Sequence, residues 1–271
     1  MIEWFLNLSP IIQGLLATLF TWFITALGAS IVFFFKNFNR KVLNTMLGFG
    51  AGVMVAASFW SLLNPAIELS EELGYSGFLI PAIGFFLGGV FIIASDKFMD
   101  KNSYGIIIDK NNTGSKKSNY RKSILLVLAV TLHNIPEGLA VGVAFGGVAA
   151  GIPGSSIAAA LALALGIGLQ NFPEGAAVSL PLRSEGVSRR KSFWYGQLSG
   201  VVEPIAGVIG VVAALTIRNM LPFLLSFSAG AMIAVVGAEL LPEASLENKK
   251  LTTLGLVLGF IVMMVLDVAL G

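Results

Sequence analysis

Long apolar stretches follow one another along almost the whole chain, and they restrict its fold more than any other feature. We identify eight of them, at roughly 11–35, 43–66, 78–96, 123–149, 155–181, 193–216, 222–244 and 252–270. A helix of about 20 apolar residues is long enough to cross the hydrocarbon core of a bilayer. The sequence therefore predicts an all-α integral membrane protein with eight transmembrane helices in a single domain, residues 1–271.

The composition agrees with a membrane protein and excludes several other classes. Hydrophobic residues make up 56% of the chain and charged residues only 12%, which leaves little material for a soluble domain. The first stretch is predicted to be an uncleaved span, because Glu3 and no Lys or Arg precedes it. The chain has no Cys, so disulfides and thiolate metal ligands are excluded.

Basic residues are distributed unevenly over the links between the apolar stretches. Lys and Arg near the ends of spans mark the cytoplasmic side of a membrane. With the N-terminus outside, 16 of the 17 basic residues fall on inner links and only Arg218 falls outside, whereas Glu68 lies on an outer link. We therefore expect a multi-pass protein of the inner or plasma membrane with both termini outside. Nucleic-acid binding is not expected, because the basic residues are scattered over short links.

Two further features concern organisation. The longest link, about residues 98–122, is rich in Lys, Asn, Ser and Gly and predicts a flexible cytoplasmic loop. Residues 49–56 and 227–234 read FGAGVMVA and FSAGAMIA, and the predicted topology gives them opposite directions. Such a pair is typical of an inverted-repeat transporter. Chance similarity is the alternative, since Gly and Ala are common where membrane helices meet.

Two related polar hexapeptides interrupt the fourth and fifth apolar stretches. Residues 133–138 read HNIPEG and residues 170–175 read QNFPEG. A charged side chain at mid-bilayer costs at least ~2.5 kcal/mol, so such residues usually mark a functional site. Because residues four apart share a helix face, each Glu should lie beside the first residue of its own motif. The prolines should disturb the helices, and the glycines should allow close packing.

A third acid, Glu203, followed by Pro204, lies near the centre of the sixth stretch. One imidazole, three carboxylates and several amide oxygens form a ligand set that suits a divalent first-row cation. Buried together, the acids would require a cation or protons to be tolerated. A zinc hydrolase is not expected, because its helix motif needs two His bracketing a Glu and this chain has 1 His. We therefore expect no enzyme.

The paired hexapeptides and the Glu-Pro of the sixth stretch resemble the ZIP (Zrt/Irt-like) family of divalent metal transporters, in particular its GufA-type branch. The resemblance covers essentially the whole chain. It implies an inverted-repeat fold that carries zinc into the cytoplasm by alternating access, with Fe²⁺, Mn²⁺, Co²⁺ and Cd²⁺ as further candidates. We also expect membrane lipid around the protein and a homodimer formed through its scaffold helices; packing within one subunit is the alternative role of the small residues there. An ion-coupled secondary transporter of another small solute is the alternative, since such carriers also use broken helices.

The resemblance further implies roles for individual residues. A primary metal site would use His133, Glu137, Gln170 and Glu174, with Met54 close by, and a second site would use Asn134, Asn171 and Glu203. Ser61 and Glu68 would form the entrance, and Glu239 and Glu243 would line the inward exit. Asn171 stands where relatives often carry an acid, so we expect one tightly bound ion. A Met in a membrane helix is more often a packing residue than a ligand.

Overall fold

The computed structural model describes residues 2–35, 39–107, 115–152, 155–184, 186–246 and 248–270. Helices are the only regular elements in these ranges. They are α1 (Ile2–Leu6), α2 (Pro10–Ala29), α3 (Ile31–Phe34), α4 (Arg40–Ala57), η1 (Ser58–Leu63), α5 (Asn64–Glu72), α6 (Leu79–Ile107), α7 (Ser115–Ala149), α8 (Ile157–Ser184), α9 (Arg189–Leu198), α10 (Val202–Thr216), η2 (Arg218–Met220), α11 (Leu221–Val235), η3 (Val236–Leu240), α12 (Leu241–Ala244) and α13 (Lys249–Leu270).

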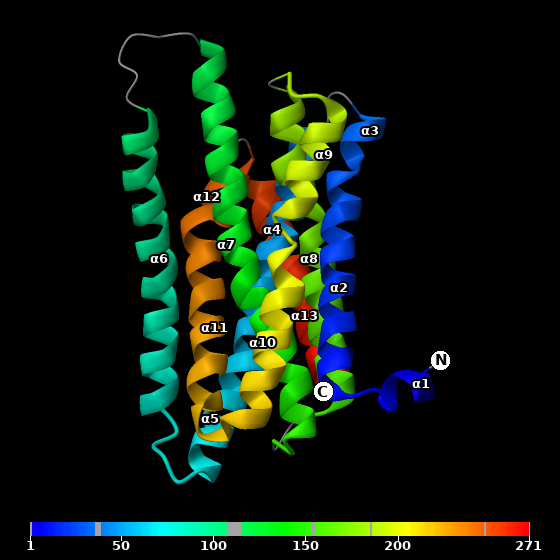
Figure 1. Cartoon of the computed structure of the whole chain (residues 1–271), viewed down its shortest axis with the longest axis vertical. Helices are drawn as coiled ribbons and strands as arrows, with labels where there is room; N and C mark the ends of the chain where they lie inside the picture. Colours follow the sequence, from blue (N-terminus) through cyan, green and yellow to red (C-terminus); the bar gives the residue numbers. More distant parts are fainter. Residues whose placement is uncertain are drawn as a thin grey trace.

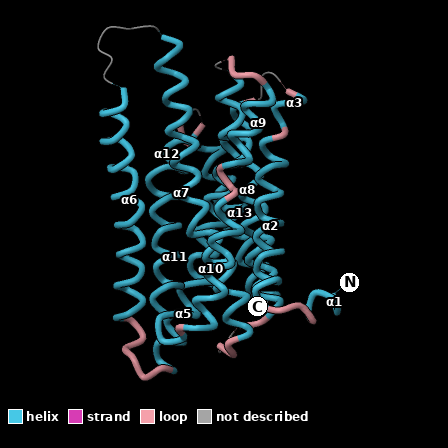
Figure 2. The backbone as a smooth tube through the Cα atoms, in the orientation of Figure 1, coloured by secondary structure: helices cyan, strands magenta, loops and turns pink. Residues whose placement is uncertain are grey.

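The long helices form an elongated bundle in which they run alternately up and down, with both termini at the same end (Figures 1 and 2). Six helical segments of the described residues are long and apolar enough to cross a membrane: Pro10–Phe34, Arg40–Glu72, Ile157–Ser184, Arg189–Thr216, Arg218–Ala244 and Lys249–Ala269. The prediction of an all-helical, multi-pass membrane protein is confirmed. The total of eight spans stays a prediction, with α6 and α7 as the remaining two.

The expected loop over residues 98–122 was wrong in its extent. Helix α6 continues to Ile107 and helix α7 begins at Ser115, so helix covers both flanks of the expected loop. Residues 108–114 lie outside the described residues. A helix satisfies its own backbone hydrogen bonds in water as well as in lipid, so hydropathy marks the membrane boundary and not the end of the helix.

Glycines allow the main helix pairs to approach closely. Helix α4 packs on α13, α11 on α6, α10 on α7, and α2 on α8. A Cβ atom on Gly138 would lie 2.5 Å from the backbone oxygen of Glu203, and one on Gly175 would lie 2.0 Å from that of Thr25. Neither position could hold a side chain without separating the helices. The predicted packing role of both hexapeptide glycines is therefore confirmed.

The sequence repeat continues as a repeat in local structure. Helices α4 and α11 contain residues 49–56 and 227–234, and each is followed by a π-helical segment, η1 and η3. Each segment then leads into a short α-helix with a proline in its first turn, Pro65 in α5 and Pro242 in α12. π-Helical turns are rare and often occur near functional sites. Both halves of the repeat therefore depart from α-helix at corresponding points.

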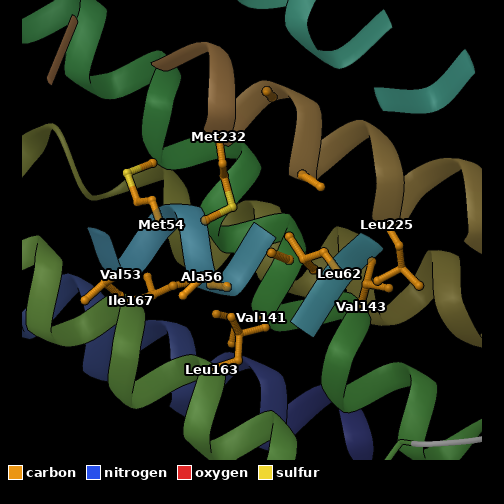
Figure 3. Packing of buried hydrophobic residues seen from close by; sticks show 14 of the residues in the cluster. Val53, Met54, Ala56, Leu62, Val141, Val143, Leu163, Ile167, Leu225 and Met232 are labelled. Atoms are coloured by element: carbon orange, nitrogen blue, oxygen red, sulfur yellow. The ribbon is translucent and has the colours of Figure 1, made fainter. Parts of the chain in front are cut away.

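A hydrophobic cluster fills the space between α4, η1, α7, α8 and α11, and its labelled members include Leu62, Val141 and Ile167 (Figure 3). On α7 the members of this cluster follow Glu137, and on α8 all of them except Ala177 precede Gln170. Helix α7 runs toward the end of the bundle that holds the termini, and α8 runs away from it (Figure 1). On these two helices, most of the apolar layer therefore lies between the polar residues of the hexapeptides and that end.

Candidate metal site

The hexapeptide side chains are buried inside continuous helices. Pro136 lies within α7 and Pro173 within α8, and neither proline ends its helix. His133 and Glu174 each expose 3% of their surface. The remaining polar members of the two motifs expose none: Asn134, Glu137, Gln170 and Asn171. Such complete burial is costly for polar groups unless they are bonded to each other or to a ligand.

Hydrogen bonds join the acids of α7 and α10 through two amides of α8. The Gln170 Nε2 donates to Glu137 Oε1 at 2.5 Å and to Asn171 Oδ1 at 3.1 Å. The Asn171 Nδ2 donates to Glu203 Oε1 at 3.0 Å and to Glu203 Oε2 at 2.9 Å. The carboxylates therefore belong to one polar cluster, but amide side chains separate Glu137 from Glu203.

Glu203 is positioned by a break in the sixth predicted span. Helix α9 ends at Leu198 and α10 begins at Val202, so Glu203 lies in the first turn of α10. Pro204 lies in the same first turn and does not kink a continuous helix, because a proline near a helix start removes no internal hydrogen bond. The positive end of the α10 dipole also favours a carboxylate at this position.

The predicted exit residues lie next to the predicted metal ligands. The His133 Nε2 lies 2.6 Å from Glu239 Oε1 of η3. A cavity of about 20 Å³ is lined by His133, Glu174, Glu239 and Glu243, together with four apolar residues. Carboxyl groups from α8, η3 and α12 therefore line the same small cavity as the imidazole of His133.

Several buried oxygens of this cluster have no hydrogen-bond partner among the described residues. They are Asn134 Oδ1, Glu137 Oε2, Gln170 Oε1 and both carboxylate oxygens of Glu174. A buried acceptor without a donor costs about 1–3 kcal/mol, and more when it is charged. Carboxylate and amide oxygens beside an imidazole suit a divalent cation, which could satisfy several of them at once. The donor set therefore fits a metal ion.

The described residues contain no compact group of three or more His, Asp or Glu side chains ready to hold a metal ion. Gln170 and Asn171 lie between Glu137 and Glu203, so these two acids do not meet directly. Glu174 has no hydrogen-bond partner among the described residues. Convergence of the three acids on a single point is therefore not observed, although Glu137 and Glu203 share a hydrogen-bonded cluster.

Met54 lies in the main hydrophobic cluster with 1% of its surface exposed, and Figure 3 labels it together with Met232. Gly50, one turn earlier on the same face of α4, lies against α8: a Cβ there would be 3.3 Å from the Cβ of Gln170. That geometry puts Met54 on the face of α4 that borders α8. Among the described residues, the polar contacts of the site do not include Met54, so its ligand role stays a prediction.

The predicted entrance residues line a larger cavity at the end of the bundle that holds the termini. This cavity measures about 290 Å³, and Ser61, Glu68, Val143 and Leu163 are among its lining residues. Asp267, which also lines this cavity, accepts a hydrogen bond of 2.6 Å from the Ser61 hydroxyl. Sequence reasoning missed Asp267, although an Asp within the apolar stretch 252–270 carries the same signal as the other intramembrane acids.

Sequence reasoning also missed two threonines of α2. Thr21 and Thr25 are buried, and their hydroxyls contact the carboxylate of Glu203. No signal in the sequence distinguishes them, because a Thr in a membrane helix ordinarily bonds to a carbonyl of its own helix.

A family model described as "ZIP Zinc transporter" matches residues 108–267, which include both hexapeptides and Glu203. The chain belongs to the ZIP family. This ZIP chain is 41% identical over 332 residues to the zinc transporter ZIP11 of Xenopus tropicalis, covering 97% of the chain and 98% of that protein. It is 37% identical over 262 residues to the zinc transporter GufA of Myxococcus xanthus, covering 95% and 99%.

A third ZIP relative is the zinc transporter ZupT of Clostridium perfringens, with 36% identity over 282 residues and 96% of each chain covered. Family membership confirms the resemblance inferred from the hexapeptides. The names of these relatives describe transporters and not enzymes, in agreement with the expectation that the chain has no enzymatic role.

Proposed function

We propose that this ZIP chain transports divalent metal ions, zinc above all, across the cell membrane into the cytoplasm by alternating access. The observation that carries the proposal is the group of buried oxygens on Glu137, Gln170 and Glu174 that have no hydrogen-bond partner among the described residues, in helices α7 and α8 of a membrane protein. Membership of a family with relatives named as zinc transporters supports zinc as the substrate. The same ligand types accept Fe²⁺, Mn²⁺, Co²⁺ and Cd²⁺.

One ion is bound tightly at the centre of the site. Glu137, Gln170, Glu174 and His133 supply its ligands, and Met54 approaches from α4. Asn134, Asn171 and Glu203 complete the polar surroundings on the side of α10. The cavity beside Glu174, at about 20 Å³, has space for little more than one water molecule, which favours an ion over a larger solute.

The path of the ion follows the order of polar and apolar layers along the bundle. Ser61 and Glu68 collect the ion in the cavity at the outer end. The hydrophobic cluster then separates this cavity from the central site. Glu239 and Glu243 lie on the far side of the site and lead the ion to the cytoplasm. Because the apolar layer offers the ion no oxygen or nitrogen ligand from its side chains, the protein must rearrange during each cycle.

The membrane arrangement that we propose is a single transporter domain of residues 1–271 with eight spans, an inverted repeat, and both termini outside. Pairing of α4 with α13 corresponds to that of α11 with α6, and pairing of α2 with α8 to that of α10 with α7. The matching π-helical segments add support. Exposed apolar side chains on α13, such as Leu258 and Val265, suit lipid or the second copy of a homodimer.

Uptake of radioactive zinc into proteoliposomes containing the purified protein tests the proposal. We expect wild-type protein to accumulate zinc and Glu174→Gln to lose nearly all uptake, since the substitution removes charge and keeps shape. The control is Glu72→Gln, whose carboxylate pairs with Arg218 at 2.8 Å on the exposed surface. Wild-type vesicles that take up no zinc, or equal uptake by the Glu174 variant, would refute the proposal.

A further inference from the structure

Thr21 of α2 contacts the candidate metal site but is not one of its predicted ligands. Its side chain is fully buried, and its hydroxyl donates to Glu203 Oε2. The same hydroxyl lies 3.0 Å from the backbone oxygen of Thr18 in its own helix. The hydroxyl of Thr25, one turn later, lies 3.5 Å from Glu203 Oε1. Helix α2 therefore holds the Glu203 carboxylate through side-chain hydroxyls.

The fixed carboxylate determines which way the Asn171 amide faces. The Asn171 Nδ2 is surrounded by three acceptors: both carboxylate oxygens of Glu203 and the backbone oxygen of Thr21, at 3.2 Å. A reversed amide would place Oδ1 against these oxygens and lose every hydrogen bond. The amide oxygen of Asn171 must therefore point toward Gln170.

The Asn171 oxygen in turn determines which way the Gln170 amide faces. The Gln170 Nε2 lies between Asn171 Oδ1 and Glu137 Oε1, which are both acceptors. Its Oε1 is consequently turned away from them and has no hydrogen-bond partner among the described residues. A reversed Gln170 would present an NH₂ group to a cation instead of an oxygen. The orientation of this amide therefore decides whether Gln170 can be a ligand.

We propose that Thr21 is a positioning residue of the metal site, which acts through Glu203 and Asn171 to keep the Gln170 amide oxygen directed at the ion. Glu203 then serves as the anchor of this hydrogen-bonded relay, not as a direct ligand. The inference rests on the proposed function, since it assumes that an ion binds beside Gln170. Groups that orient metal ligands from a second layer are common in metal sites.

Cobalt binding to the purified full-length protein tests the proposal, with Co²⁺ as both ligand and spectroscopic probe. Thr21→Val keeps the shape of the side chain and removes the hydroxyl. We expect it to weaken Co²⁺ binding by about tenfold or more and to shift the visible absorption bands of bound Co²⁺. Thr21→Ser should restore both properties. Thr18→Val is the matched control, because the Thr18 hydroxyl bonds, within the described part of the chain, only to the carbonyls of Gly14 and Leu15 in its own helix.

A second background separates positioning from general packing. In Gln170→Glu, both side-chain oxygens are equivalent, so the relay has no amide orientation left to control. Thr21→Val should then have almost no further effect on Co²⁺ affinity. Equal affinity and spectrum for Thr21→Val and wild type would overturn the proposal, as would an equal loss in the Gln170→Glu background. Wild-type protein that binds no Co²⁺ would instead count against the proposed function.

Discussion

The buried acids of the site differ in how many hydrogen-bond donors they contact. Glu203 has donors on both carboxylate oxygens, from Thr21 and Asn171. Glu137 has a donor on one oxygen only, and Glu174 has none among the described residues. A cation is attracted most strongly to the carboxylates with the least compensation. The positive charge of a bound ion should therefore lie closest to Glu174 and Glu137.

This order leads to a prediction for charge-removing variants. Glu174→Gln should weaken Zn²⁺ binding most, by roughly 3–5 kcal/mol, the scale seen when one partner of a buried charge pair is removed. Glu203→Gln should weaken it by only about tenfold, as expected for a group behind the ligands. Isothermal titration of each purified variant with Zn²⁺ checks the order. A larger loss for the Glu203 variant would contradict it.

Met54 offers a separate residue-scale prediction. A thioether is a soft ligand that prefers Cd²⁺ to Mn²⁺, whereas carboxylates favour harder ions. If Met54 approaches the ion, Met54→Leu should reduce Cd²⁺ affinity several-fold and leave Mn²⁺ affinity nearly unchanged. Competition binding with both ions measures the ratio. Equal affinities for both ions in the variant and wild type would assign Met54 to packing alone, as its place in the hydrophobic cluster also allows.

Pairs of closely packed helices hold these residues in position. Neighbouring glycines of α6 show how specific the packing is. A Cβ on Gly88 would lie 1.9 Å from the backbone oxygen of Phe227 in α11, whereas a Cβ on Gly89 would have its nearest neighbour at 3.7 Å. The first glycine therefore meets the partner helix, and the second has room for a methyl group.

Alanine substitutions at these adjacent positions should have opposite effects. Gly88→Ala forces α6 and α11 apart and should destabilise the protein by about 1–3 kcal/mol. Gly89→Ala should be neutral or stabilising by up to about 1 kcal/mol, because Ala is the better helix former. Thermal unfolding in detergent, followed by circular dichroism, compares the two variants. An equal loss for both would show that α6 tolerates no side chain on either face.

At the scale of the whole molecule, polar and apolar layers alternate along the axis of the bundle. The cavity at the end that holds the termini is lined by Ser61 and Asp267, the hydrophobic cluster follows, and the buried acids lie beyond it beside Glu239. The hydrophobic cluster therefore lies between this cavity and the proposed central site.

The proposed topology can be tested directly, since the chain has no native Cys. A membrane-impermeant maleimide applied to intact cells should label Glu3→Cys and spare Lys250→Cys. Asn112→Cys distinguishes the span counts, because it lies in the link between α6 and α7 that eight spans put inside. We expect Asn112→Cys to be labelled only after the cells are permeabilised. Labelling in intact cells would favour six spans.

The amino-acid sequence by itself determined the membrane class, the positions of the helices and the polar residues of the site. Apolar length is a local property, and the cost of burying His133 or Glu174 in lipid is large enough to mark each as a candidate site residue. The resemblance to the ZIP family, now confirmed, rested on the same short motifs.

Only the tertiary structure decided how these residues meet. Three features depend on contacts between distant segments: the break that puts Glu203 at a helix start, the hydroxyl of Thr21 beside it, and the location of Asp267 in the cavity lined by Ser61. Hydropathy also could not locate the ends of α6 and α7, because a helix can continue into water. Hydrogen bonds between side chains of different helices depend on packing geometry, which local sequence patterns do not contain.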